Sequence, residues 1–137
     1  MALIHLDAGV VIGLLDAEDT HHRSATDALV AAQHSGARLA MAASACAECL
    51  VGPSRRGARA VATVGELFQR LPIHIVELDA DTVRRAAALR AKHAALRLPD
   101  AFVLATAAEH SADQLITTDR RWPTTRKLGL DLTITVL

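Results

Sequence analysis

The stretch LIHLDAGVVIGLL, residues 3–15, contains two apolar runs separated by Asp7-Ala8-Gly9. The first run predicts a strand over residues 2–6, and the second predicts a short helix from about 9 to 16. The same alternation continues to the end of the chain, with further strands expected over 38–42, 73–78, 114–118 and 132–136. Strands that alternate with helices predict an α/β fold with a mostly parallel sheet.

The segments between these strands carry helical patterns with recognisable ends. The first helix is expected over 20–35, with Gly36 as its C-cap, and the next over 45–51, with Ser44 as its N-cap and Gly52-Pro53 as its end. Two further helices are expected over 57–71 and from Asp79 or Asp81 to 96. The last is expected over 100–111, with Pro99 in its first turn.

Length and cysteine content limit the classes of protein to consider. The chain has 137 residues and 14.5 kDa, which predicts a single domain over 1–137. No apolar run is long enough to span a bilayer, so no membrane association is expected. Cys46 and Cys49 are the only cysteines and have no second pair for zinc, so we interpret them as buried apolar residues. We expect a protein of the reducing cytoplasm, because the N-terminus lacks a basic secretion signal.

The formal net charge is zero, but the charges are unevenly distributed. Residues 1–53 contain two basic and six acidic residues, whereas residues 54–137 contain thirteen basic and nine acidic ones. This asymmetry is a weak indication of an anionic partner on one face. Aromatic residues make up only 2% of the chain, which disfavours the base-stacking surfaces of single-strand binders.

Four acidic residues occupy positions where ligands bind in open α/β sheets. Asp7 and Asp119 directly follow predicted strands, Glu48 lies early in the helix after the second strand, and Asp100 lies in a first helical turn. Ligands bind beyond the carboxyl ends of parallel strands, so the four side chains could converge there. Structural roles are open for three of them: Asp7 and Asp119 could be caps, and Asp100 could complement a helix dipole.

Converging carboxylates repel one another unless a cation neutralises them or some are protonated. Ligand sets made only of oxygen select hard divalent ions such as Mg²⁺ or Mn²⁺. Such ions activate water and stabilise a leaving oxygen during in-line hydrolysis of a phosphodiester. The acids therefore favour a metal-dependent phosphodiester hydrolase.

Four segments resemble, in order and spacing, the motifs of PIN-domain ribonucleases, and within that family the VapC-type toxins: LDAGVVI (6–12), AECL (47–50), LPDAFVLATA (98–107) and LITTDR (115–120). The resemblance covers essentially the whole chain and implies a three-layer sandwich with Asp7, Glu48, Asp100 and Asp119 as catalytic and metal-binding residues. It further implies an endoribonuclease toxin of a bacterial type II toxin–antitoxin system, which cleaves RNA with Mg²⁺ or Mn²⁺, forms homodimers and is inhibited by a VapB-type antitoxin.

One position departs from the family's pattern. The family usually has Ser or Thr two residues after the first Asp, where this chain has Gly9. A hydroxyl that would support the site is missing, which leaves Thr118 or water to take its place. Gly9 also keeps open a degenerate PIN fold that only binds a partner. It weighs against a haloacid-dehalogenase-type phosphatase, which needs a second Asp at that position.

Basic residues follow the last of the four acids. Arg120 and Arg121 stand next to Asp119 in the sequence. Arginine side chains bind the phosphates of a nucleic-acid backbone, and we therefore assign these two residues to RNA binding.

Overall fold

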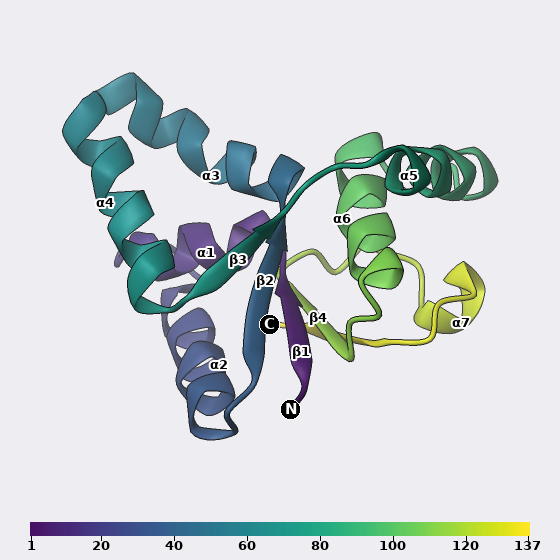
Figure 1. Cartoon of the computed structure of the whole chain (residues 1–137), viewed down its shortest axis with the longest axis horizontal. Coiled ribbons are helices and arrows are strands. Elements are labelled where there is room, and N and C mark those ends of the chain that lie inside the picture. The colour runs from purple at the N-terminus through teal and green to yellow at the C-terminus, as the bar shows by residue number, and fades with distance from the viewer.

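The computed structural model describes residues 1–137 and contains one five-stranded sheet with helices on both faces (Figure 1). The elements are β1 (Leu3–Leu6), α1 (Ala8–Leu15), α2 (His22–His34), β2 (Arg38–Ala42), α3 (Ala43–Arg56), α4 (Ala58–Arg70), β3 (Ile73–Val76), α5 (Ala80–Lys92), α6 (Leu98–Glu109), β4 (Gln114–Thr117), α7 (Thr125–Leu128) and β5 (Thr133–Val136). The strand order is β3-β2-β1-β4-β5 and every pairing is parallel. The predicted α/β sandwich is confirmed, and its sheet is parallel throughout.

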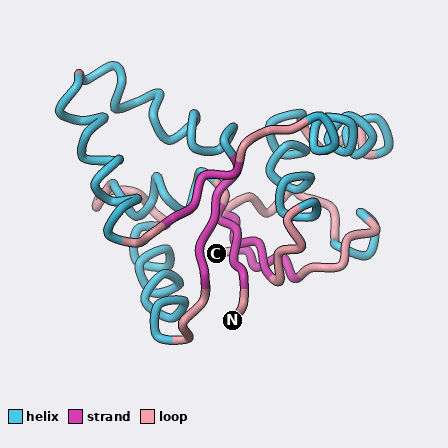
Figure 2. The backbone as a smooth tube through the Cα atoms, in the orientation of Figure 1, coloured by secondary structure: helices cyan, strands magenta, loops and turns pink.

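The helices form a layer on each side of the sheet (Figures 1 and 2). Helices α1 and α2 lie on one face and α5 and α6 on the other, while α3 and α4 form an antiparallel pair that extends away from the end of β2. None of the helices has both the length and the apolar character needed to cross a membrane.

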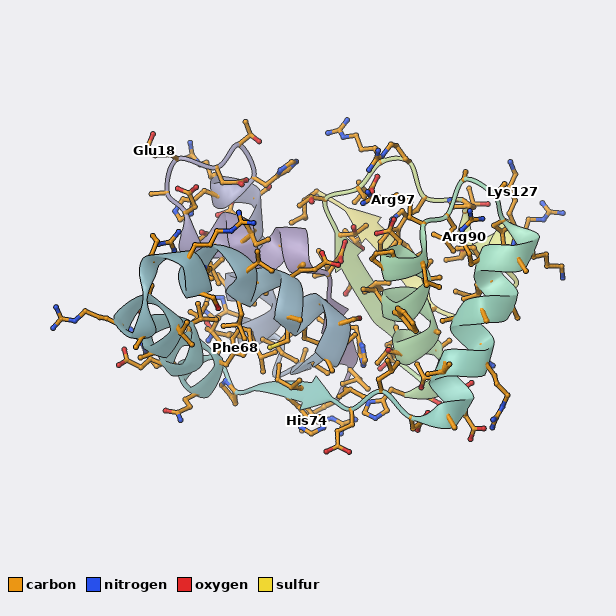
Figure 3. The ribbon with its side chains drawn as sticks, turned by 90° about the horizontal axis from the view of Figure 1, so that it is seen from above. Glu18, Phe68, His74, Arg90, Arg97 and Lys127 are labelled. Atoms are coloured by element: carbon orange, nitrogen blue, oxygen red, sulfur yellow. The ribbon has the colours of Figure 1, made fainter.

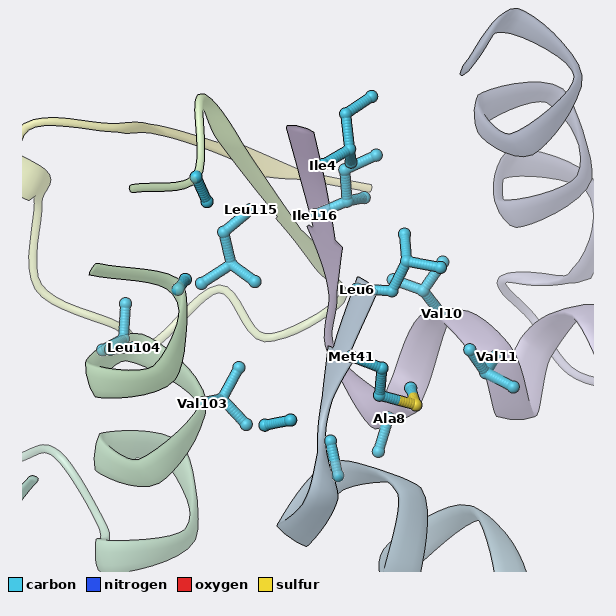
Figure 4. Close-up of a cluster of buried hydrophobic side chains, with 14 of the residues drawn as sticks. Ile4, Leu6, Ala8, Val10, Val11, Met41, Val103, Leu104, Leu115 and Ile116 are labelled. Atoms are coloured by element: carbon cyan, nitrogen blue, oxygen red, sulfur yellow. The ribbon is translucent and has the colours of Figure 1, made fainter. Parts of the chain in front are cut away.

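The central strand β1 is buried on both faces, as parallel strands usually are. Leu6 is fully buried and lies near Val10 of α1 on one side of the strand, whereas Leu104 of α6 and Leu115 of β4 lie on the other side (Figure 4). The apolar run at residues 3–6 therefore holds the two helical layers together. It also fixes where Asp7 leaves the sheet.

Several predicted helix ends were wrong. Helix α3 does not stop at residue 51 but continues through Pro53 to Arg56. The Pro53 ring is buried, and the helix ends instead at Gly57, whose φ of 113° a side chain would disfavour. Ser44 is not its cap: the extended residue Ala42 precedes the helix, and the Ser44 hydroxyl lies inside it, buried and without a partner.

Two differences occur in the second half of the chain. Helix α5 ends at Lys92 rather than at 96, and a short loop leads to Arg97, the N-cap of α6. The expected Pro99 in the first turn of that helix is confirmed. The short helix α7 was not predicted. It begins after Thr124, whose hydroxyl accepts a hydrogen bond from the Lys127 amide, and ends at the left-handed Gly129.

A buried histidine interrupts the apolar strand β1. His5 is 1% exposed and neither ring nitrogen has a hydrogen-bond partner. Its ring meets that of His110 edge to face at 5.6 Å, and His110 stacks on His74 at 6.3 Å. Burial, reinforced by these two histidines, lowers the pKa of His5 to about 4.

We expect His5→Leu to raise the free energy of unfolding at neutral pH by about 1–2 kcal/mol, because an unpaired buried polar group is costly. The gain should grow as the pH falls from 6.5 toward 4, where the unfolded chain binds a proton that native His5 cannot. Urea unfolding of parent and variant across this range measures the difference. The exposed His34→Leu is the matched control, and an equal effect there would contradict the prediction.

Candidate acidic site at the carboxyl edge of the sheet

Asp7 lies where β1 ends and α1 begins. Its Oδ1 accepts a hydrogen bond of 2.8 Å from the Ala8 amide, so it caps the helix, and its Oδ2 accepts one of 2.7 Å from the Thr117 hydroxyl. The residue is 9% exposed. The predicted cap and the predicted site residue are therefore the same carboxylate, held in one orientation from two sides.

Thr117 is a site residue that the sequence analysis missed. It is fully buried at the end of β4, opposite the end of β1. Its hydroxyl donates to Asp7 and accepts a hydrogen bond of 3.1 Å from the Asp119 amide, so it links the two acids. The signal was present in the sequence: a threonine closes the strand that directly precedes Asp119.

The other acids approach this edge from separate elements. Glu48 lies in the second turn of α3, and Asp100 lies in the first turn of α6 with a side chain only 15% exposed. Asp119 follows β4, and its side chain is 17% exposed.

The carboxylates lie close enough to affect one another's pKa values. Burial raises the pKa of Asp7 to about 6 despite its two hydrogen bonds, and repulsion by Asp100 and Glu48 adds to the increase. The pKa values of Glu48 and Asp100 are also raised, first by burial and then by repulsion from a neighbouring acid. Repulsion thus links Asp7, Glu48 and Asp100, and Asp119 joins them through its repulsion of Asp100 and its hydrogen bond to Thr117.

Two arginines partly neutralise this cluster. Arg121 binds Asp119 through both of its oxygens, at 3.0 and 3.1 Å, and this pairing lowers the pKa of Asp119. Arg97 approaches Asp100 at 3.6 Å, and its charge limits the increase in the pKa values of Asp100 and Glu48. Figure 3 labels Arg97, which lies at the end of the loop between α5 and α6. Arg120 is exposed at the rim.

The donor set consists of carboxylate oxygens and hydroxyls, which suits a hard divalent cation. In this arrangement no three acidic, histidine or cysteine side chains form a group that could hold an ion. Asp100 and Asp119 instead face their arginines. A cation bound among the acids would therefore replace arginine–carboxylate pairs.

The cysteines play a different role. Cys49 is buried against α1, with its Sγ 3.8 Å from the Ala8 carbonyl, and burial raises the pKa of its thiol to about 12. Cys46 is half-buried and also free. A thiol with so high a pKa is a poor nucleophile and a poor metal ligand at neutral pH.

Comparison with known proteins identifies the fold family. The PIN domain model matches residues 4–128. The chain belongs to the PIN domain family. No curated protein sequence matches it.

Solved structures include several with the same architecture. A toxin–antitoxin complex from Klebsiella pneumoniae is similar with 26% identity, 87% coverage of both chains and a TM-score of 0.66. VapBC2 from Rickettsia felis, bound to a promoter DNA fragment, has 13% identity, 98% coverage of both chains and a TM-score of 0.72. VapC20 from Mycobacterium tuberculosis, a toxin that cleaves the sarcin–ricin loop, has 18% identity, covers 82% of this chain and 86% of its own, and has a TM-score of 0.66.

We expect Asp7→Asn to stabilise the metal-free PIN domain. Native Asp7 has a pKa of about 6 against an ordinary value of 3.8, so the folded state loses stability as the pH rises between these values. The neutral amide avoids that loss, which predicts a gain of about 1–3 kcal/mol at pH 7. Thermal unfolding in EDTA measures it. Asp27→Asn on the exposed face of α2 is the control, and an unchanged or lowered stability of Asp7→Asn would refute the explanation.

Proposed function

We propose that this PIN domain, as a single unit of 137 residues, is a metal-dependent endoribonuclease toxin of a type II toxin–antitoxin system. The observation that carries the proposal is that acids from four distant segments approach one edge of the sheet, where repulsion between neighbouring acids contributes to the raised pKa values of Asp7, Glu48 and Asp100. A cluster that destabilises the resting protein needs a functional reason, and cation binding provides one.

Asp7, Glu48, Asp100 and Asp119 would hold Mg²⁺ or Mn²⁺ in this proposal. When bound, such an ion supplies the positive charge that acidifies water and stabilises a leaving oxygen. Asp7 provides a fixed oxygen, because Thr117 and the Ala8 amide leave its carboxylate little freedom. Glu48 has the longer side chain and a raised pKa, which suits a group that orients the attacking water.

The arginines are proposed to bind the RNA backbone. Arg120 is exposed, and Arg121 lies beside Asp119. Arg97 joins this set on structural grounds, because its side chain is 69% exposed at the rim of the acidic cluster. A guanidinium released from a carboxylate is free to make paired hydrogen bonds to a phosphate.

A VapB-type antitoxin is the proposed regulator. The similar Klebsiella pneumoniae structure is a toxin–antitoxin complex, and the Rickettsia felis structure is VapBC2. A pocket of about 370 Å³ between α1 and α3 is lined by Ile12, Leu15 and Glu48, so a segment bound there would contact one of the four acids. We further propose a homodimer held by apolar helix faces, and action in the cytoplasm, where RNA and antitoxin meet.

A binding module without catalysis remains the second candidate. The observation in its favour is that no three of the acids form a group ready to hold an ion. Membership in the PIN domain family removes the phosphatase alternative.

We expect RNA cleavage to stop in EDTA and to return with added Mg²⁺ or Mn²⁺. Asp100→Asn should lower the rate at least about a hundredfold at saturating metal, because it removes one charge from the cation's ligands. The purified protein and a structured RNA, with Asp27→Asn as a control of equal charge change, provide the test. Full cleavage in EDTA, or by Asp100→Asn, would favour the binding module.

We expect the product of an adjacent small reading frame to form a complex with this chain and to block cleavage. The physical reason is that a basic antitoxin side chain could neutralise the acidic cluster as a metal does. Co-purification followed by cleavage assays of the complex and the free chain measures the effect. A complex that cleaves RNA as fast as the free protein would refute inhibition.

A further inference from the structure

Gly9, in the first turn of α1, leaves room for a hydroxyl from another strand. A Cβ at this position would stand closer than 3.0 Å to Oγ1 of Thr118, 3.4 Å from its Cβ and 3.6 Å from its Cγ2. Real Cβ atoms essentially never approach another atom so closely. The Thr118 side chain therefore occupies the space that a side chain at residue 9 would need.

This close contact is specific to one glycine. A Cβ added at Gly36, Gly57, Gly65 or Gly129 would meet nothing within 4 Å, and one added at Gly13 would make contacts no closer than 3.4 Å. Gly9 has no positive φ, so its backbone does not require glycine. The close contact therefore comes from the Thr118 side chain and not from the backbone at residue 9.

The hydroxyl in this space belongs to a residue that is flanked in the chain by two residues of the acidic site. Thr118 stands between Thr117, which binds Asp7, and Asp119, which binds Arg121. Gly9 lies two residues after Asp7 in the helix that Asp7 caps. Thr118 is half-buried, and its hydroxyl takes part in no hydrogen bond within the chain, unlike that of Thr117. A partly exposed hydroxyl without an internal partner is available to a bound group.

We propose that Thr118 is a positioning residue of the acidic site, whose hydroxyl, admitted by the absent side chain of Gly9, supports the bound divalent cation. The inference rests on the proposed function. A hydroxyl offers an oxygen without adding negative charge to a cluster that already repels itself. Gly9 and Thr118 form one unit: a side chain at residue 9 displaces the hydroxyl of residue 118.

Four variants separate this role from simple packing. Thr118→Val keeps the shape and removes the hydroxyl, whereas Thr118→Ser keeps the hydroxyl. Gly9→Ser places two side chains in one space. Gly9→Ser combined with Thr118→Ala returns a single hydroxyl to that space from the α1 side.

Calorimetric titration of the metal-free variants with Mn²⁺ is the primary measurement, with melting temperatures to verify folding. Thr118→Val should weaken Mn²⁺ binding about tenfold or more, as the loss of a supporting partner does at metal sites. Thr118→Ser should bind like the parent. The double variant should bind Mn²⁺ more tightly than Gly9→Ser or Thr118→Val.

Cleavage assays give a second readout. The Mg²⁺ concentration for half-maximal cleavage should rise in Thr118→Val, while the rate at saturating Mg²⁺ stays near the parent value. Parent-like Mn²⁺ affinity in Thr118→Val would overturn the inference, as would a double variant no better than Gly9→Ser. If Gly9→Ser fails to fold, the two single Thr118 variants still decide.

Asp7→Asn distinguishes this failure from a failure of the proposed function. If Asp7→Asn loses Mn²⁺ binding while Thr118→Val keeps it, only the role of Thr118 is wrong. If neither substitution changes Mn²⁺ binding, the metal site itself is wrong.

Discussion

The buried carboxylate of Asp7 is the constraint on which the rest of the site depends. It leaves the sheet at the end of a strand that is buried on both faces, so its place is set by the core rather than by the surface. Two hydrogen bonds hold it there, one from the helix it caps and one from the adjacent strand β4. These bonds compensate only part of the cost of burial, because the pKa of Asp7 is still raised to about 6.

Two consecutive threonines, at the end of β4 and directly after it, make different contacts near this carboxylate. Thr117 faces inward and connects Asp7 to the backbone of Asp119, so it fixes the distance between two strand ends. Thr118, the first residue after the strand, lies over the first turn of α1, where the absent side chain of Gly9 leaves room for it.

The sequence predicted the parts of the fold that depend on periodic apolar patterns. Strand β2 lies exactly where the pattern placed it, and β1, β3 and β4 differ only at their ends. The patterns could not predict where tertiary packing overrides a local signal. Pro53 is compatible with α3 because its ring is buried, and Ser44 lies within the helix that it was expected to cap.

The site, like the fold, has features that the sequence predicted and features that it could not predict. The four acids could be proposed from sequence because each follows a strand or opens a helix, and strand order then brings them to one edge. The arginine–carboxylate pairs could not be predicted from the sequence, because they depend on the conformation of the loops. The sequence pattern predicted a helix up to residue 96, yet α5 ends at Lys92 and Arg97 is the N-cap of α6, beside Asp100. Arg121 was assigned to RNA alone, yet it binds Asp119.

These pairs explain how the acids can remain together before a cation binds. Four carboxylates with two guanidinium groups leave an excess of negative charge, and that excess is greatest around Asp7 and Glu48, which have no arginine of their own. The two pairs lie at the rim, where water weakens ion pairs, so exchanging them costs little. In the proposed mechanism a divalent cation held by the acids would take over this neutralising role, which would leave the guanidinium groups of Arg97 and Arg121 available to the phosphates of an RNA. The same two groups would then serve first the resting protein and then the bound RNA.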